Sequence, residues 1–216
     1  MTALTFPPVE MADESGLLAV GGQLDVANLE TAYRSGIFPW PVEGYPVLWF
    51  APPKRAILEF SELRVSERLR RYLRKSNFSF RVDADFEGVI RACANSSNRK
   101  SQTGTWITED MIRGYIEFHK AGFAHSFETV DADNQLIGGL YGVLMDNYFA
   151  GESMFFKEAN ASKFALIQTV QHLQGLGLSW MDVQVMTPLL KSFGAREIHR
   201  EHFMQKMKEA LLAWKT

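Results

Sequence analysis

Three apolar, strand-like runs follow one another near the middle of the chain, with only short connections between them. They cover residues 125–130, 136–144 and 148–155, and turn-forming residues at 131–134 and 145–147 separate them. Turns this short join antiparallel neighbours, because parallel strands need a much longer crossover. The sequence therefore predicts an antiparallel sheet in this part of the fold.

A helix, a strand and a second helix are predicted after these runs. The first helix begins after Asn160, ends near residues 175–177 and has an apolar face made of Leu166, Ile167, Val170 and Leu173. A strand over residues 179–185 and a short helix ending near Gly194 come next. This order predicts an α+β fold whose main domain is an acetyltransferase-like (GNAT-like) mixed sheet with flanking helices.

Two further helices are expected before the sheet. Ser66 is placed to cap a helix with an apolar stripe that contains Leu69 and Leu73, and Glu67 is expected to pair with Arg71 four residues later. The second helix is predicted over residues 108–122, where Thr108 is the cap and acidic residues occupy the first turn.

The first part of the chain is rich in Gly, Pro and Trp and shows one helical pattern. Asp25 is placed to cap this helix and Gly36 to end it. We therefore expect two domains, a small irregular N-terminal lobe of residues 1–60 and a catalytic domain of residues 61–216.

Several classes of protein are disfavoured by what the sequence lacks. The single cysteine, Cys93, excludes an internal disulfide and a cysteine-built zinc site. No phosphate-loop or dinucleotide signature occurs, and the five histidines lack metal-ligand spacing, so neither a cofactor nor a metal is expected. Residues 1–14 do not resemble a secretory signal, and no run of about 20 apolar residues occurs. We expect a cytoplasmic protein without a membrane segment.

Basic residues are concentrated in one short segment of an otherwise acidic chain. Residues 64–75 contain six basic residues and one acid, although the formal net charge of the whole chain is -2. Such an island is suited to binding a polyanion at one place, and a solvated helix face is the alternative. The candidate contacts for nucleic acid are Arg70, Arg71, Arg74 and Lys75.

A few polar residues interrupt the apolar strands. Glu152 and Ser153 lie in the third run, and Asp182 and Gln184 lie two apart in the later strand, so they should point to the same face. Burying a carboxylate is costly unless it is paired, so these residues are candidates for a site. The alternative is that Asp182 makes a structural bond to a helix N-terminus or to an arginine.

Taken together, these residues resemble the leucyl/phenylalanyl-tRNA–protein transferase family. The similarity covers nearly the whole chain and includes Phe38-Pro39-Trp40, Gly151-Glu152-Ser153 and Asp182-Val183-Gln184. All matching stretches, in order, are residues 16–22, 32–40, 104–108, 124–126, 138–143, 151–155, 160–163, 182–184 and 192–198. Val183 replaces the cysteine that is usual in the family, which excludes a thioester at this position. Leu140 replaces a methionine found in some relatives.

The resemblance implies an enzyme that moves Leu or Phe, with Met as a further donor, from aminoacyl-tRNA to the N-terminal Arg or Lys of proteins. The product would be a degradation signal, and no cofactor would be needed. The implied catalytic residues are Asp182, Gln184 and Glu152. Gln184 would hold the amine, Asp182 would polarise Gln184 and finally accept the proton, and Glu152 would hold the cationic acceptor residue or orient the amine. The implied substrate-binding residues are Trp40, Trp106, Leu140, Phe149, Ser153 and Met154. The basic segment would contact the acceptor stem of the tRNA and leave its 3' end in the site.

Two other functions remain open from the sequence. One is an acyl-CoA-dependent N-acyltransferase, although residues 156–159 lack the glycines expected of a pyrophosphate site. The other is a non-catalytic tRNA-binding protein, for which the basic segment alone would suffice. Loop tryptophans such as Trp40 and Trp106 also have a purely structural alternative, in which they cover the core.

Overall fold

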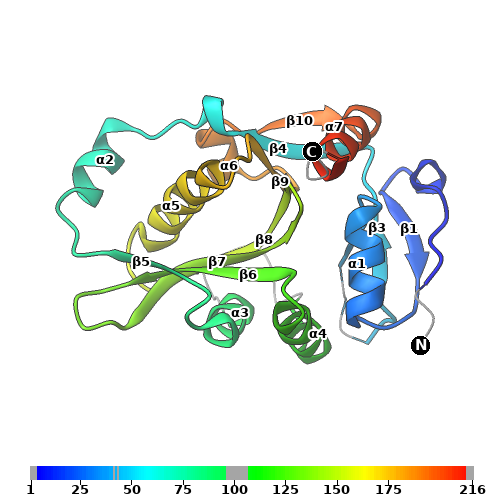
Figure 1. Ribbon diagram of the computed structural model, residues 1–216, viewed down its shortest axis with the longest axis horizontal. Coiled ribbons are helices and arrows are strands. Elements are labelled where there is room, and N and C mark those ends of the chain that lie inside the picture. The colour runs from blue at the N-terminus through cyan, green and yellow to red at the C-terminus, as the bar shows by residue number, and fades with distance from the viewer. Residues whose placement is uncertain (1–3, 41, 43, 96–106, 213–216) are drawn as a thin grey trace.

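The fold of this chain contains two β-sheets with helices packed around them (Figure 1). The computed structural model describes residues 4–40, 42, 44–95 and 107–212. The smaller sheet has the order β1-β3-β2 and the larger has the order β10-β4-β9-β8-β7-β6-β5. The predicted α+β class, with a mixed sheet and flanking helices, is therefore confirmed.

The smaller sheet and one helix make up the beginning of the chain. Its elements are β1 (Leu17–Val20), α1 (Val26–Arg34), β2 (Phe38–Pro39) and β3 (Leu48–Phe50). The predicted helix is confirmed, because Asp25 accepts a bond from the amide of Asn28 and Gly36 has a φ of 73°. The next strand, β4 (Lys54–Glu59), already lies in the larger sheet. The division into residues 1–60 and 61–216 stays a prediction.

The strands of the larger sheet agree closely with the predicted runs. They are β5 (Ser79–Val82), β6 (Ala124–Val130), β7 (Leu136–Met145), β8 (Tyr148–Phe156), β9 (Trp180–Gln184) and β10 (Arg196–His199), in addition to β4. All neighbours pair antiparallel except β8 and β9, which are parallel. The sequence pattern did not predict β4, β5 and β10; of these, β5 and β10 are short and mostly exposed.

Helices cover both faces of the larger sheet. On one face lie α3 (Phe86–Ala94) and α4 (Glu109–Lys120), and on the other lies α5 (Ala161–Gly175), which connects β8 to β9 (Figure 1). Gly138 of β7 lets α5 begin close to the sheet, because a Cβ at this position would lie 2.6 Å from that of Ala161. The remaining helices are α2 (Glu67–Leu73), α6 (Pro188–Ser192), α7 (Arg200–Leu212) and the short 3-10 turns Val9–Met11 and Phe60–Glu62.

Two local predictions require correction. Glu67 pairs with Arg74 at 3.3 Å and not with Arg71, because the short helix ends near residue 74 and lets that side chain fold back. Asn160 precedes α5 as expected, but its side chain makes no capping bond. Its φ is 66°, and its side-chain oxygen accepts a bond from Lys163 at 2.9 Å instead.

Candidate active site

Two β-bulges face each other where the parallel strands β8 and β9 meet. In β8, Glu152 is the extra residue, because Gly151 and Ser153 lie opposite the consecutive residues Gly142 and Tyr141. In β9, Val183 is extra in the same way, since Asp182 and Gln184 lie opposite Ile57 and Ala56. Bulges bend a strand and redirect its side chains, and they often occur beside functional sites. Here they direct Glu152 and Gln184 toward each other.

Asp182 is fully buried and surrounded by hydrogen-bond donors. Arg55 of β4 binds both of its oxygens through Nε, at 2.9 and 3.0 Å, and Oδ2 also through Nη2 at 2.7 Å. The hydroxyl of Tyr148 donates to Oδ2 at 2.7 Å, and the backbone amide of Gln184 donates to Oδ1 at 2.8 Å. Such a bidentate arginine pair fixes geometry as well as charge.

Arg55 is itself buried and enclosed by aromatic rings. Its guanidinium carbon lies 4.4 Å from the centre of the Phe38 ring and 4.6 Å from that of Phe203, and Nη1 donates to the carbonyl of Gly36. Burial opposes the charge of the guanidinium, but the carboxylate of Asp182 outweighs it and raises the pKa of Arg55 above its usual value. Arg55 therefore keeps its charge in the interior, where good geometry with a carboxylate offsets the cost of burial.

The backbone of Gln184 has an unusual conformation, which follows from the contacts of Asp182. Its φ is 60°, and the amide of Val185 donates to the carbonyl of Val183 at 2.7 Å, which makes a γ-turn centred on Gln184. This conformation is rare for a residue other than glycine and carries strain. The turn lets the side-chain amide of Gln184 donate to Oε1 of Glu152 at 2.6 Å.

Glu152 connects the sheet to the first helix of the chain. Its Oε1 also accepts a bond from the hydroxyl of Tyr33 of α1 at 2.6 Å, and that hydroxyl is hydrogen-bonded to the hydroxyl of Tyr115 of α4. Burial raises the pKa of Glu152 to about 7, although the bond from Tyr33 works in the opposite direction. Its Oε2 is shielded from solvent and has no hydrogen-bond partner among the described residues.

Comparison with known proteins places this sequence in a family. The sequence profile for the leucyl/phenylalanyl-tRNA protein transferase matches residues 57–208, and the profile for the N-terminal domain of the same transferase matches residues 22–53. The chain belongs to this family. The resemblance that the sequence motifs indicated is thereby confirmed.

Individual relatives in the family match over most of their length. A leucyl/phenylalanyl-tRNA–protein transferase of Pseudomonas fluorescens is 49% identical over 203 residues, which cover 93% of this chain and 88% of the relative. The transferase of Flavobacterium johnsoniae is 47% identical, and the match covers 95% of this chain and 96% of the relative. Among solved structures, L-PGS from Bacillus licheniformis has a TM-score of 0.44 and 11% identity over 70% of this chain and 48% of that chain. The acetyltransferase-like type of the sheet is not confirmed by this similarity.

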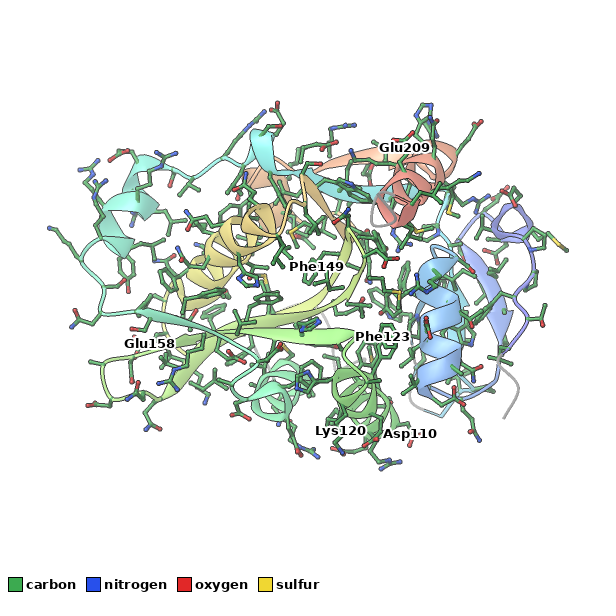
Figure 2. The ribbon with its side chains drawn as sticks, in the orientation of Figure 1. Asp110, Lys120, Phe123, Phe149, Glu158 and Glu209 are labelled. Atoms are coloured by element: carbon green, nitrogen blue, oxygen red, sulfur yellow. The ribbon has the colours of Figure 1, made fainter. Side chains whose placement is uncertain are left out.

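The structure describes all but one of the other residues expected from the family, and they lie in different surroundings. Leu140 and Phe149 are buried in the cluster between the larger sheet and α5, and Met154 packs against it; Figure 2 shows Phe149 close to β8, β9 and α5. Ser153 is half-buried beside Glu152. Trp40 packs against the other cluster, with its ring centre 6.3 Å from that of Phe38. Trp106 lies outside the described residues.

The predicted tRNA-binding residues lie on the surface of one helix. Arg70, Arg71, Arg74 and Lys75 are all exposed, on α2 and just after it. This helix lies at one end of the molecule, whereas α1 and β1 lie at the other end (Figure 1). Arg70 donates to the carbonyl of Val65, and Arg74 pairs with Glu67, so part of the charge is already balanced.

Four residues of the centre were not predicted from the sequence. Tyr33, Arg55 and Tyr115 lie far from Asp182 and Glu152 in the chain, so no spacing connects them. Tyr148 lies in β8 with Glu152, but there it is one more member of an apolar run. A weak signal was present for Arg55, since it begins an apolar run that continues to Leu58. The alternative in which Asp182 binds an arginine is what the structure shows, and such a bond is compatible with a role in the site.

Two kinds of feature are absent from the described part of the chain. No group of three or more His, Cys, Asp or Glu residues suited to a metal ion occurs there. None of the helices in that part has the length and apolar character required to cross a bilayer.

Proposed function

We propose that this chain transfers a leucyl or phenylalanyl group, with methionyl as a further donor, from aminoacyl-tRNA to the N-terminal amine of a protein. The acceptor would begin with Arg or Lys, and the product would be marked for degradation in the cytoplasm. The names of the relatives at 47–49% identity support the donor and the protein acceptor. The observation that carries the chemistry is the bond between Gln184 and Glu152 at the junction of β8 and β9.

The reaction makes modest demands because the aminoacyl ester is already activated. The acceptor ammonium must lose a proton, its nitrogen must attack the ester carbonyl, and the bond to the terminal ribose oxygen must break. One proton leaves to a base before the attack, and a second moves to the departing ribose oxygen. The protein therefore needs a positioned acceptor for the amine and a base matched to neutral pH.

We assign these tasks to Gln184 and Glu152. Because the amide nitrogen of Gln184 donates to Glu152, its amide oxygen remains to accept a bond from the attacking amine. Glu152 would take the proton, since its pKa of about 7 suits a general base and its Oε2 has no partner among the described residues.

Asp182 would act on this pair indirectly. Its oxygens already accept bonds from Arg55, Tyr148 and the Gln184 amide, which leaves it poorly placed to receive a proton from the amine. In this proposal it fixes the turn at Gln184. In the alternative, Asp182 itself is the final proton acceptor and has a direct role in the pH dependence of the transfer rate.

Substrate contacts follow from the surrounding residues. The apolar aminoacyl side chain would lie among Leu140, Phe149 and Met154, and Ser153 would line the same part of the site. Trp40 and Trp106 would pack beside the terminal adenosine or the pocket wall. The cations of α2 would bind acceptor-stem phosphates without reading sequence.

The finer description of the fold belongs to the same proposal. An acetyltransferase-like domain over residues 61–216, preceded by a lobe of residues 1–60, is supported by the parallel β8–β9 pair and its connection through α5. The two matching family profiles also divide between residues 53 and 57.

One assay tests the proposed function directly. Labelled leucine should pass from leucyl-tRNA to a peptide that begins with Arg, and to a lesser extent or not at all to the same peptide beginning with Glu. Acetyl transfer from acetyl-CoA, with none from leucyl-tRNA, would instead favour an acyl-CoA-dependent enzyme. Binding of tRNA without either transfer would favour a non-catalytic binding protein.

A further inference from the structure

Tyr33 belongs to α1, next to the smaller sheet, yet its hydroxyl ends against a carboxylate of the larger sheet. The residue is fully buried, and its hydroxyl donates to Oε1 of Glu152 at 2.6 Å. The hydroxyl of Tyr115, which is also fully buried, contacts the hydroxyl of Tyr33. Three segments that lie far apart in the sequence thus meet in one chain of hydrogen bonds that ends at Glu152.

The direction of these hydrogen bonds follows from the groups involved. A hydroxyl has a single proton to donate, and an ionised carboxylate can only accept. If Tyr33 donates to Glu152, the proton between the two tyrosines must come from Tyr115. The chain therefore runs from Tyr115 to Tyr33 to Glu152, and each donor strengthens the next.

A purely structural purpose would not require this arrangement. The two tyrosine hydroxyls could satisfy each other, and Glu152 already accepts a bond from Gln184. The additional bond instead fixes the rotation of the carboxyl group. With Oε1 held by both Tyr33 and Gln184, Oε2 is the oxygen left without a partner among the described residues.

We propose that Tyr33 is a positioning residue for the transfer reaction, which orients Glu152 so that Oε1 faces Gln184 and Oε2 faces the acceptor amine. Tyr115 supports it from α4. The reactive centre would then be complete only when α1 is packed against the larger sheet. This inference rests on the proposed function, because it assigns Glu152 the task of taking the proton.

The proposal makes a prediction about pH because Tyr33 stabilises the ionised form of Glu152. Removal of its hydroxyl should raise the pKa of Glu152, since the bond from Tyr33 opposes the effect of burial. Other groups that act on Glu152 are unchanged by this substitution. They are Tyr115 of α4, Tyr148 of β8, Asp182 and Gln184 of β9, and Arg55 of β4.

The decisive experiment compares the pH dependence of kcat for the wild type and Tyr33→Phe, with leucyl-tRNA and an Arg-initiated peptide. The wild-type rate should rise with pH through about 7. In Tyr33→Phe the rising limb should move upward by about 1 pH unit, the order expected for one hydrogen bond to a charged group. The rate at alkaline pH should recover toward that of the wild type, and KM for the tRNA should change little.

Matched variants separate this role from a structural one. Tyr45→Phe changes an exposed tyrosine of the same part of the chain and should leave the pH profile unchanged. Tyr115→Phe should move the limb in the same direction by a smaller amount, and it decides the question if Tyr33→Phe does not fold. A loss of rate that is equal at every pH, without a shift of the limb, would overturn the proposal. If the wild type transfers no leucine, it is the proposed function that fails.

Discussion

Glu152 and Asp182 are two carboxylates of one site, and their neighbours suit them to different tasks. Asp182 is held by an arginine, a tyrosine and a backbone amide, so its negative charge is matched by a positive one. Glu152 accepts bonds only from the neutral groups of Tyr33 and Gln184 among the described residues, and burial raises its pKa to about 7. Carboxylates held by such different partners often divide acid–base roles between them.

Replacement of Glu152 by Gln tests its role as the base. The amide cannot take a proton at neutral pH, so kcat should fall by about 10²–10⁴-fold, the usual contribution of a positioned base. The rising limb of the wild-type pH profile near 7 should disappear in the variant. Single-turnover rates across the neutral range, on both sides of that limb, measure both effects. A variant that keeps the limb would show that another group titrates there.

The same substitution has a consequence for stability. The folded-state pKa of Glu152 is raised from 4.5 to about 7, so the stability that this group contributes is present at low pH and is lost as pH rises across that window. The amide side chain of the Glu152→Gln variant cannot ionise, so the variant lacks this loss. The difference in melting temperature, Glu152→Gln minus wild type, should therefore grow as pH rises from 4.5 to about 7. It should keep growing above that pH as long as part of the wild-type Glu152 is still protonated. A constant difference across this range would contradict the pKa shift.

At the scale of single elements, the sequence predicted most of the fold that surrounds the site. The strands β6 to β9 and the helices α1, α4 and α5 follow their apolar patterns within one or two residues. The bulges at Glu152 and Val183 were not predictable, because a bulge depends on the register of two strands and not on the pattern of one. The γ-turn at Gln184 follows from its bond to Asp182, which the residue spacing alone does not reveal.

The candidate site was predictable only in part for a related reason. Asp182, Gln184 and Glu152 stand out as polar residues within apolar strands. Their partners do not, because Arg55 is 127 residues from Asp182 in the sequence and Tyr33 is 119 residues from Glu152. Tyr33 was placed on the apolar face of its helix, which is correct, but burial alone does not indicate what its hydroxyl contacts.

The basic helix α2 gives a prediction at the scale of an element. Replacement of Arg70, Arg71, Arg74 and Lys75 by Ala should raise KM for aminoacyl-tRNA and reduce the salt dependence of binding. Each phosphate contact with a duplex contributes a slope of about 0.9 in the plot of log affinity against log salt, so the slope should fall by up to about 3 or 4. Titration of tRNA at several salt concentrations measures this change.

Two comparisons show whether this effect comes from phosphate contacts. Turnover of a minimal aminoacyl-adenosine donor should change little, because this donor lacks the acceptor stem. Replacement of two exposed lysines elsewhere, Lys120 of α4 and Lys208 of α7, should leave the slope unchanged. An equal loss of activity with both donors would instead indicate that α2 has a structural role.

At the scale of the whole molecule, polar contacts between described residues join the segment around α1 to the larger sheet. The hydroxyl of Tyr33 meets Glu152, the carbonyl of Gly36 accepts a bond from Arg55, and Arg34 pairs with Asp146 at the β7–β8 turn. The first two are buried and involve residues that hold the proposed reactive groups. The same contacts therefore hold the two sheets of the molecule together and arrange the site (Figure 1).

The buried pair of Arg55 and Asp182 joins β4 to β9 within the larger sheet and should contribute strongly to stability. Removal of one partner leaves the other charge buried without compensation, which typically costs about 3–5 kcal/mol. Arg55→Met and Asp182→Asn should each lower the melting temperature by roughly 10 °C, since about 2–4 °C corresponds to 1 kcal/mol in a chain of this size. The double variant should lose much less than the sum of the two.

The partly exposed pair of Arg34 and Asp146 provides the matched control, because it is also an arginine–carboxylate pair between segments far apart in the sequence. Their side chains are 41% and 24% exposed, so either substitution, Arg34→Met or Asp146→Asn, should cost less than about 1 kcal/mol. Activity distinguishes the pairs further. The folded fraction of Asp182→Asn should still turn over slowly, because the turn at Gln184 loses its anchor, whereas the Asp146→Asn protein should keep its normal rate. Similar small losses of stability for both pairs, with normal turnover in Asp182→Asn, would contradict the role given to Asp182.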